Sequence, residues 1–447
     1  MASRENLPRS MRYALTSVPA IEADSTLARF DSTNGVSFSP TGANEIRIRV
    51  KANGFLNGAK HYLYFKVTTA TAASFVDGDA GSFFDRMTIE SNGTQVEQID
   101  RYALWNGIRR NYNADVYEIN KKSVESGGGQ LASIATTTVG GVDKVALSNL
   151  GEAIATGHSK IFCIQLQSGL LMNSHGKALP DGLNELEIVL RLKTANGALV
   201  SIGADAPTYV IADPRIYCPV YRVMNGDVMS SYNQLASQGI SWIGDTVKTY
   251  VNSVANTTTG TLQLNDRSMS LKALITALRS NTADSTRGTY SNTSFFLGNG
   301  TGLVTDYLAK IAGVNYPQSQ ILIQTATNGL NIGRCYEEAI KSLAKHGEKY
   351  ANAQVDRHQF KSSAVTYTSA TDTGAIDSAK GLLCVDLRKF DDAELRMVGL
   401  NTASNASPSI LELNISTAMG LILDATTFAL VEAIWTMDNT GALRVAM

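Results

Sequence analysis

Charged residues are scarce in this sequence. They make up 18% of its 447 residues, whereas an average soluble domain carries about 25%. Lys and Arg number 39 and Asp and Glu number 40, so the formal net charge is −1. This balance excludes a dedicated basic surface for nucleic acid or anionic lipid as the main role of the chain. The polar remainder is mostly Ser, Thr, Asn, Gln and Gly, which is typical of strand-rich proteins with many turns and of surfaces that meet copies of themselves.

Cysteine is rare as well. The four cysteines, Cys163, Cys218, Cys335 and Cys384, are widely spaced and form no CxxC pair. This spacing excludes a zinc signature and a disulfide scaffold. Because Cys163, Cys218 and Cys384 lie in alternating apolar runs, we predict that they are buried thiols.

Long apolar runs are absent. No segment reaches the roughly 18 apolar residues that a membrane-spanning helix requires, and residues 1–15 lack the apolar core of a signal peptide. We therefore expect a protein that is made and kept inside a cell until it assembles or is released.

Histidines and acidic residues form no recognisable metal or catalytic motif. The five histidines, none of them in an HxH or HExxH pattern, are His61, His158, His175, His346 and His358. We interpret His158 and His175 as solvated or turn-bonded loop residues. Asp77-Gly78-Asp79 resembles the start of a calcium loop, but Gly81 occupies its fifth position and Thr88 its twelfth. We therefore predict a turn there.

Two further patterns could carry chemistry. Residues 298–302 read GNGTG and precede a helical pattern, but the spacing is GxGxG, no GK[ST] follows, and no acidic residue lies about 20 positions later. We interpret this segment as a flexible loop. The carboxylates of Asp85, Glu90, Glu97 and Asp100 could pair as in a glycosidase, but charges on the solvent face of strands explain them better. No GxSxG elbow is present, so the sequence predicts no enzyme and assigns no catalytic, cofactor-binding or metal-binding residue.

Period-two alternation of apolar and polar residues dominates the pattern, and it predicts half-buried strands. In the first half these strands are expected at 44–51, 61–67, 86–99, 160–167, 183–193 and 209–223. Within 44–51, Ile46, Ile48 and Val50 oppose Arg47 and Arg49. Asn92-Gly93 predicts a two-residue hairpin loop, because both positions of such a turn need a positive φ, which Asn and Gly readily adopt. A loop there would pair Ile89 with Val96. Pro214 and Pro219 place the strand 209–223 at an edge or a bend.

Helical spacing occurs near the middle of each half. Tyr102, Trp105, Ile108 and Tyr112 share one helix face, and residues 334–345 form a second amphipathic helix. We also expect a helix at 303–312 and a connector with a short helix at 224–238. The segments 123–129, 136–141 and 280–302 read as irregular loops. Second-half strands are expected at 242–254, 260–264, 269–278, 319–324, 381–387, 409–415, 427–437 and 442–445.

The order of elements therefore repeats, although no residue-level repeat is present. Many short strands separated by turn signals favour sandwiches or jelly rolls. We predict a mainly β protein of two antiparallel eight-stranded jelly rolls side by side, each with one or more short helices. The expected division is an N-terminal arm at 1–20, a first jelly roll at 21–223, a connector at 224–238 and a second jelly roll at 239–447.

The ordered set of segments resembles the double-jelly-roll major capsid proteins, the lineage of tailless membrane-containing phages, adenovirus-type hexons and large DNA viruses with their small relatives. The resemblance covers roughly residues 33–447. In the first half it rests on residues 38–40, 44–48, 54–56, 62–65, 77–86, 89–102, 164–171 and 177–188. In the second half it rests on residues 314–317, 336–337, 384–387, 399–402 and 411–415.

The resemblance implies a structural role. It implies three copies that form a pseudo-hexagonal capsomer, capsomers that tile an icosahedral virion shell, and strands roughly normal to that shell. It also implies assembly inside the host cell and contacts with penton and minor capsid proteins, without a small-molecule substrate. Residues 1–20 carry Arg4, Arg9 and Arg12, and we hypothesise that this arm touches an internal membrane, the genome or a neighbouring trimer. A disordered terminus is the alternative.

A non-viral β-sandwich binding protein, such as an adhesin or carbohydrate-binding module, is the second interpretation. Aromatic side chains on exposed strand faces would favour it, and Tyr62, Tyr64 and Trp242 are the candidates.

Overall fold

Most of the chain between residues 23 and 447 is described by the computed structural model. The residues outside the description are 1–22, 52, 71–73, 114–131, 140–141, 149, 173–177, 202–206, 282–294, 296, 298–302, 326–328, 331, 345–349, 352, 354, 356–359, 361–379, 391–396, 405–407, 417, 419 and 421. The predicted arm at 1–20 and the glycine-rich loop at 298–302 therefore lie outside it, as do His175, His346 and His358. Within the described ranges, no helix is both long enough and apolar enough to cross a membrane.

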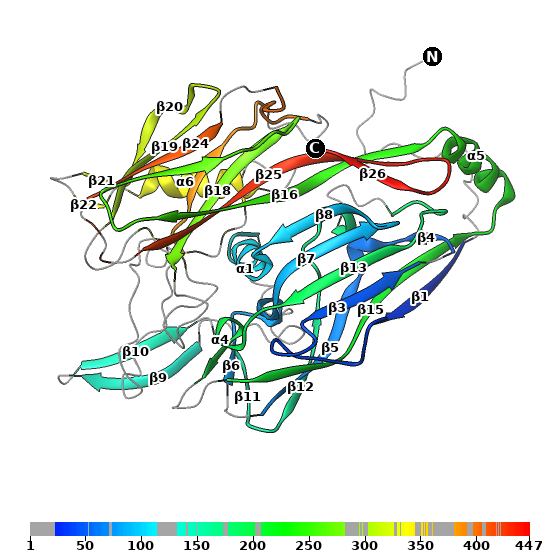
Figure 1. Cartoon of the computed structure of the whole chain (residues 1–447), viewed down its shortest axis with the longest axis horizontal. Helices are drawn as coiled ribbons and strands as arrows, with labels where there is room; N and C mark the ends of the chain where they lie inside the picture. The colour runs from blue at the N-terminus through cyan, green and yellow to red at the C-terminus, as the bar shows by residue number, and fades with distance from the viewer. Residues whose placement is uncertain are drawn as a thin grey trace, which may run out of the picture.

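The first roll consists of two facing antiparallel sheets (Figure 1). One has the order β1 (Ala23–Asp31), β15 (Tyr209–Val223), β5 (Tyr62–Thr69) and β12 (Ser159–Ile164), and β2 (Ser37–Phe38) and β4 (Phe55–Leu56) also pair with β15. The other has the order β3 (Glu45–Val50), β13 (Leu186–Leu192), β7 (Phe84–Ser91) and β8 (Thr94–Asp100).

Shorter elements complete this roll. The helical elements are η3 (Gly58–Lys60), η4 (Ala80–Phe83), α1 (Tyr102–Asn113), α3 (Gly169–Met172) and α4 (Ala195–Ala198). A small sheet joins β11 (Leu150–Ile154), β6 (Ser74–Asp77) and β14 (Leu199–Ser201), and a hairpin joins β9 (Ala132–Val139) to β10 (Val142–Ser148).

The second roll follows α5 (Gly226–Ser237), which lies at one end of the molecule in Figure 1. Its first sheet has the order β16 (Ile240–Val254), β25 (Leu423–Met437), β18 (Leu271–Ser280) and β23 (Leu383–Asp386), and β26 (Leu443–Ala446) also pairs with β25. Its second sheet has the order β17 (Thr259–Leu264), β24 (Ser409–Ile415), β19 (Val304–Ile311) and β20 (Val314–Leu322). A two-stranded pair of β21 (Gln324–Thr325) and β22 (Gly329–Leu330) precedes α6 (Gly333–Ser342).

The two rolls have the same strand order. If the eight main strands of each roll are numbered along the chain, both rolls have one sheet in the order 1-8-3-6 and one in the order 2-7-4-5. In both, a helix follows the fifth strand: α1 follows β8, and α6 comes after β20 and its short hairpin. This confirms the predicted mainly β fold of two antiparallel jelly rolls with short helices.

The segments with alternating apolar and polar residues form strands, as the sequence predicts. Buried Ile46, Ile48 and Val50 point into the first roll, while the intervening charges lie on its surface. The Asn92-Gly93 loop is confirmed, with φ values of 50° and 74°. The predicted pairing of Ile89 with Val96 is wrong, because a bulge between Ile89 and Glu90 shifts the register and places Ile89 opposite Glu97.

The predicted helix at 303–312 is also wrong, because these residues form strand β19 between β24 and β20. The pairing of β19 shifts register between Tyr307 and Ala309 on one side and between Val304 and Asp306 on the other. Each shift interrupts the two-residue alternation, so Val304, Tyr307, Leu308 and Ile311 imitate helical spacing.

Two other local predictions need correction. The strand containing Pro214 and Pro219 has β1 on one side and β5 on the other, so it is not an edge strand. A bend is present, because the β15–β5 pairing shifts between Ala212 and Arg215, where Asp213 has a φ of 50°. The loop expected at 136–141 overlaps β9, which extends to Val139, whereas 123–129 lies outside the description.

Candidate functional site

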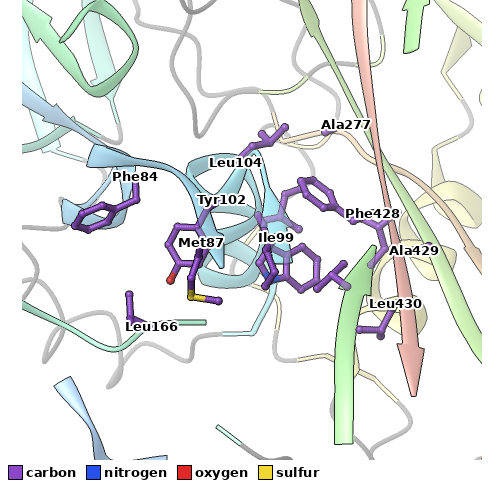
Figure 2. Close-up of a cluster of buried hydrophobic side chains, with 14 of the residues drawn as sticks. Phe84, Met87, Ile99, Tyr102, Leu104, Leu166, Ala277, Phe428, Ala429 and Leu430 are labelled. Carbon is purple, nitrogen blue, oxygen red and sulfur yellow. The ribbon is translucent and has the colours of Figure 1, made fainter. Parts of the chain in front are cut away.

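Among the described residues, the candidate site is the surface where the two rolls meet, because it combines apolar packing with buried polar contacts. Helix α1 leaves the first roll after β8 and packs on the outer face of the β16-β25-β18 sheet. Trp105 contacts Phe428 with ring centroids 5.2 Å apart. Figure 2 shows Leu104 of α1 beside Ala277 and Phe428 of the second roll, so one apolar cluster continues from roll to roll.

Burial of α1 is correspondingly high. Nine of its twelve residues are buried, including Trp105, Ile108 and Tyr112. Every residue of β18 is buried as well, which a strand with one solvent-facing side would not show. The first roll therefore covers a sheet face that the second roll would otherwise expose to water, and burial of this apolar area stabilises the pair of rolls.

Glu97 of β8 lies at the centre of the polar contacts. Its carboxylate accepts hydrogen bonds from the hydroxyl of Ser168, from the backbone N–H groups of Gly169 (2.8 Å) and Leu170 (3.3 Å), and from Oγ1 of Thr246 (2.7 Å). Glu97 is 1% exposed. Burial raises the pKa of the carboxyl, and the four hydrogen bonds oppose that shift.

The position of Glu97 corrects the prediction that all four acidic residues lie on a solvent face. Asp85, Glu90 and Asp100 are half-buried, and Asp100 pairs with Arg86. Glu97 is buried because the second roll covers the edge strand β8, a contact that alternation within one strand cannot reveal. No polar signal in the local sequence distinguishes it from its neighbours.

The chain backbones of the two rolls approach closely beside Glu97. A Cβ added at Gly169 would lie 2.0 Å from the carbonyl oxygen of Asp245. This position therefore requires glycine, because any side chain would force α3 and β16 apart.

Charged side chains at the junction form ion pairs, either between the two rolls or within the second roll next to the junction. Arg101 reaches Asp424 at 3.3 Å across the junction, and Lys272, 1% exposed, lies 3.0 Å from both carboxylate oxygens of Asp245. Burial lowers the pKa of Arg109, an effect that Asp245 opposes, and the guanidinium of Arg109 lies over the ring of Trp105. These pairs keep buried charges compensated.

Hydrogen bonds between side chain and backbone also link the two rolls, and one of them runs from Nδ2 of Asn184 to the carbonyl of Thr440 at 3.1 Å. The hydroxyl of Tyr112 donates to the carbonyl of Lys380 at 2.5 Å, and Oγ1 of Thr249 donates to the carbonyl of Asp100 at 3.2 Å. Because each of these groups has a protein partner, the arrangement holds the rolls in one relative orientation.

The two described histidines lie apart from the junction contacts. His61 is buried between η3 and the segment after β12, where its Nδ1 contacts the carbonyl of Gly58 and its Nε2 accepts from the N–H of Leu166 at 3.0 Å. Burial lowers the pKa of His61 to about 4. His158 is exposed in the turn between β11 and β12. Within the described part of the chain, no group of three His, Cys, Asp or Glu side chains could hold a metal ion.

The segment 77–79 has a structural role. Asp79 caps η4 by accepting from the N–H of Gly81 at 2.8 Å, and it accepts from Nδ2 of Asn106 at 2.7 Å. Arg110 donates to the carbonyl of Gly78. The carboxylate that suggested a calcium ligand therefore attaches α1 to the first roll.

The cysteines follow the prediction except at one position. Cys218 and Cys384 are buried as predicted, as is Cys335, whereas Cys163 is half-exposed. Cys163 lies on the outer side of β12, opposite Tyr64, so its alternating run places it outward.

Two of the three candidate surface aromatics lie on one outer sheet face. Tyr62 stacks on Tyr217 with centroids 5.1 Å apart, and the guanidinium of Arg215 lies 5.1 Å from the centroid of Tyr64. The exposed apolar side chains of the same face are Leu27 and Ile161, each 55% exposed, and Val210, which is 36% exposed. We call the set Leu27, Tyr62, Tyr64, Ile161 and Tyr217 the tyrosine face.

Trp242, the third candidate, is 6% exposed and packs in the second roll opposite Trp435, so its prediction as a surface residue is wrong.

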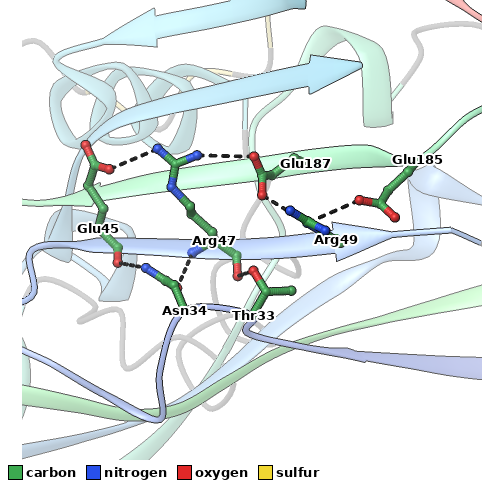
Figure 3. A network of polar contacts seen from close by, with 7 residues as sticks. All are labelled: Thr33, Asn34, Glu45, Arg47, Arg49, Glu185 and Glu187. Atoms are coloured by element: carbon green, nitrogen blue, oxygen red, sulfur yellow. Dashed lines mark hydrogen bonds and ion pairs between the residues drawn. The ribbon is translucent and has the colours of Figure 1, made fainter. Parts of the chain in front are cut away.

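The neighbouring sheet of the first roll carries a different surface. Figure 3 shows Arg47 between Glu45 and Glu187, and Arg49 between Glu185 and Glu187. These ion pairs are partly exposed, so each contributes at most about 1 kcal/mol.

We predict that Glu97→Gln destabilises the protein by roughly 2–4 kcal/mol, because an amide nitrogen would face buried donors that now share a carboxylate. Urea unfolding of the full chain measures the change. Glu90→Gln is the matched control on the half-exposed side of the same sheet, with an expected effect below about 0.5 kcal/mol. Equal stability of these two variants would contradict a structural role of the Glu97 carboxylate.

We also predict an acid-dependent loss of stability from His61. Since the pKa of His61 is about 4 in the folded protein, below its ordinary value of 6.5, the unfolded chain binds the proton first. This contribution is present above pH 6.5 and is lost as pH falls towards 4, by about 3 kcal/mol in total. Urea unfolding between pH 7 and 4 should show a shallower slope for His61→Gln, while the exposed control His158→Gln keeps the wild-type slope. Parallel slopes for all three proteins would count against this assignment.

The fold and junction can be compared with known proteins. No protein-family model and no curated protein sequence matches the chain. Similar solved structures include the Faustovirus major capsid protein, with a TM-score of 0.60, 10% identity and coverage of 94% of this chain and 92% of that one. PBCV-1 VP54 fitted into a reconstruction of the virophage Sputnik has a TM-score of 0.58, 12% identity and coverage of 97% and 99%. The mavirus major capsid protein has a TM-score of 0.54, 11% identity and coverage of 99% and 94%. Over nearly its whole length, this chain therefore has the double-jelly-roll fold of viral major capsid proteins.

Proposed function

We propose that the chain is a structural major capsid protein. Three copies form a pseudo-hexagonal capsomer, and these capsomers tile the icosahedral shell of a virion. The observation that supports this most strongly is the double-jelly-roll fold itself, shared with capsid proteins over more than nine-tenths of each chain. We propose no catalytic activity, no cofactor and no small-molecule substrate.

The junction supports an assembly role physically. A shell subunit must present its outer surfaces in a fixed relative orientation, because lattice contacts repeat only when each subunit has the same shape. Two rolls joined by one apolar cluster and by paired charges meet this requirement. The near-zero net charge limits repulsion between packed copies.

The proposed division is an arm at 1–20, rolls at 21–223 and 239–447, and a connector at 224–238. The described elements support it, since β15 ends at Val223, α5 spans Gly226–Ser237 and β16 begins at Ile240. The proposed partners are further copies of the chain, with penton and minor capsid proteins. The proposed location is the virion, after assembly inside the host cell.

A carbohydrate-binding or adhesin role is the second candidate, favoured by the half-exposed Tyr62 and Tyr64 of the tyrosine face. The burial of Trp242 reduces the aromatic surface available for it.

We predict that the purified chain forms a species of about three times its 47.9 kDa mass, because a capsomer needs three copies. Analytical ultracentrifugation over a wide concentration range measures this mass, and negative-stain electron microscopy reveals shells. A chain that stays monomeric at every concentration and binds glycans would favour the binding-protein interpretation.

We further propose that residues 1–20 face the interior of the particle, where Arg4, Arg9 and Arg12 can meet an internal membrane, the genome or a neighbouring trimer. Limited proteolysis of intact particles should then spare this segment, whereas disassembled protein loses it. Cleavage of residues 1–20 in the sealed shell would show that they are accessible from outside.

A further inference from the structure

Residues 165–172, which follow β12 and end with α3, lie between η3 of the first roll and β16 of the second. We call them the bridging segment. On one side, a Cβ added at Gly58 of η3 would lie 2.3 Å from the carbonyl oxygen of Leu171. On the other side, Gly169 makes the close approach to Asp245 of β16 described above. Since the backbone contacts are tight on both sides, a displacement of this segment from η3 also disturbs its contact with β16.

Side chains hold the backbone of the bridging segment in place. Five of its N–H groups donate to side-chain atoms, whereas in a helix or a sheet the main chain supplies the acceptors. The donors and acceptors are Leu166 to Nε2 of His61 (3.0 Å), Gln167 to the hydroxyl of Tyr102 (2.7 Å), Gly169 and Leu170 to the carboxylate of Glu97, and Leu171 to Oγ of Ser168 (3.1 Å). Figure 2 shows Leu166 near the hydroxyl of Tyr102. Two of these acceptors, the imidazole and the carboxylate, change charge at acidic pH.

The two contacts of His61 require a neutral imidazole. Its Nδ1 lies 2.5 Å from the carbonyl oxygen of Gly58, so Nδ1 carries the hydrogen and Nε2 keeps the lone pair that accepts from Leu166. A protonated ring carries a hydrogen on both nitrogens, and its Nε2–H would then face the N–H of Leu166, donor against donor. Because His61 is 3% exposed, water has little access to replace the lost acceptor.

The surroundings of His61 do not compensate a positive charge. The bridging segment contains no ionisable side chain. The ionisable residues of the other elements around the ring are Lys60 of η3, Tyr62 of β5, Tyr102 of α1 and Cys218 of β15. Burial raises the pKa of both phenols and of the thiol, so these groups stay neutral at acidic pH, and the Lys60 ammonium would repel an imidazolium. Burial accordingly lowers the pKa of His61 to about 4, although the hydrogen bond to Gly58 opposes this shift.

Glu97 responds to acid in the opposite sense. Burial raises the pKa of its carboxyl, so proton uptake by Glu97 favours the closed arrangement as pH falls through that raised pKa. The lowered pKa of His61 has the opposite sign, because an imidazole released into water binds its proton near pH 6.5 and the buried one only near pH 4. Acid therefore releases the bridging segment at its His61 end.

We propose that His61 is a pH-sensitive switch for the junction. When it takes up a proton, the bridging segment detaches from η3, and α3 loses its fixed position against β16. This opening is a property of the single chain. Its consequence for a shell rests on the capsid function proposed above: lattice contacts need one relative orientation of the two rolls, so the shell loosens as the pH falls from 6.5 towards 4.

Hydrogen exchange with mass spectrometry of the full chain at pH 7.5 and pH 5 measures the opening, after correction for the intrinsic exchange rates. The His61→Gln variant is the comparison, because glutamine offers one donor and one acceptor and takes up no proton. The contribution of Glu97 is common to both proteins and cancels. Relative to this variant, wild-type protection of residues 166–171 should fall roughly 30-fold, the factor that pKa values of 6.5 and about 4 give.

Two references show that the effect is local. The exposed control His158→Gln should behave as wild type. Strand β24 of the second roll is the internal reference, and its protection should change less than threefold while that of the bridging segment falls.

Three results would overturn the switch. The first is an equal change of protection in wild type and His61→Gln. The second is wild-type protection of the bridging segment that does not fall at pH 5, and the third is an equal fall in β24, which would mean that acid unfolds the whole chain. The second and third need only wild type, so the test holds even if His61→Gln does not fold. A chain that shows the switch but never assembles would overturn the capsid function alone.

Trp105 reports whether the junction itself loosens, because its ring is 3% exposed between the rolls. Between pH 7.5 and pH 5 its fluorescence emission should move to longer wavelength in wild type and stay unchanged in His61→Gln. The shift should be lost in Trp105→Phe, which assigns it to this ring and not to Trp242 or Trp435. An unchanged wild-type emission would show that the rolls keep their contact, and this would overturn the loosening of the junction.

Discussion

Packing of α1 against the outer face of the second roll is the interaction on which the arrangement of the molecule depends. A jelly roll on its own buries only the inner faces of its two sheets, and the outer face of β18 and β25 would then carry Ile275 and Phe428 into water. Placing Trp105 and its neighbours on that face removes this cost and fixes where the first roll must lie. The residues at positions 97 and 169 follow from this contact. Glu97 accepts hydrogen bonds from backbone N–H groups that are buried there, and position 169 is glycine because the two backbones approach too closely for a side chain.

Alternation and turn chemistry predict most of the strands, both central helices and the two-roll architecture, because these depend on local periods of two and 3.6 residues. The local sequence pattern gives wrong predictions where the pairing between strands is irregular. The bulges in β19 produce helical spacing in a strand, and the bulge after Ile89 moves the hairpin register by one residue. Such shifts depend on how a strand meets its partners, which the spacing within one segment does not record.

The junction is less predictable than the rolls. Glu97 follows the same alternating pattern as Glu90, yet one carboxylate is buried and the other half-exposed, because only β8 lies at the edge that the second roll covers. Trp242 and Tyr64 likewise both read as outward aromatics, and contacts across strands decide that only Tyr64 reaches the surface. A site formed by segments more than 100 residues apart needs the tertiary arrangement before its members can be recognised.

The long strands have a consequence for scale. Strands β15, β16 and β25 each contain 15 residues, which at about 3.3 Å per residue gives roughly 50 Å of extended chain. In a shell whose strands stand normal to its surface, this length sets the wall thickness directly. Under the capsid function proposed above, the outer loops of the subunit could then differ in length without a change in the spacing between the inside and the outside of the shell.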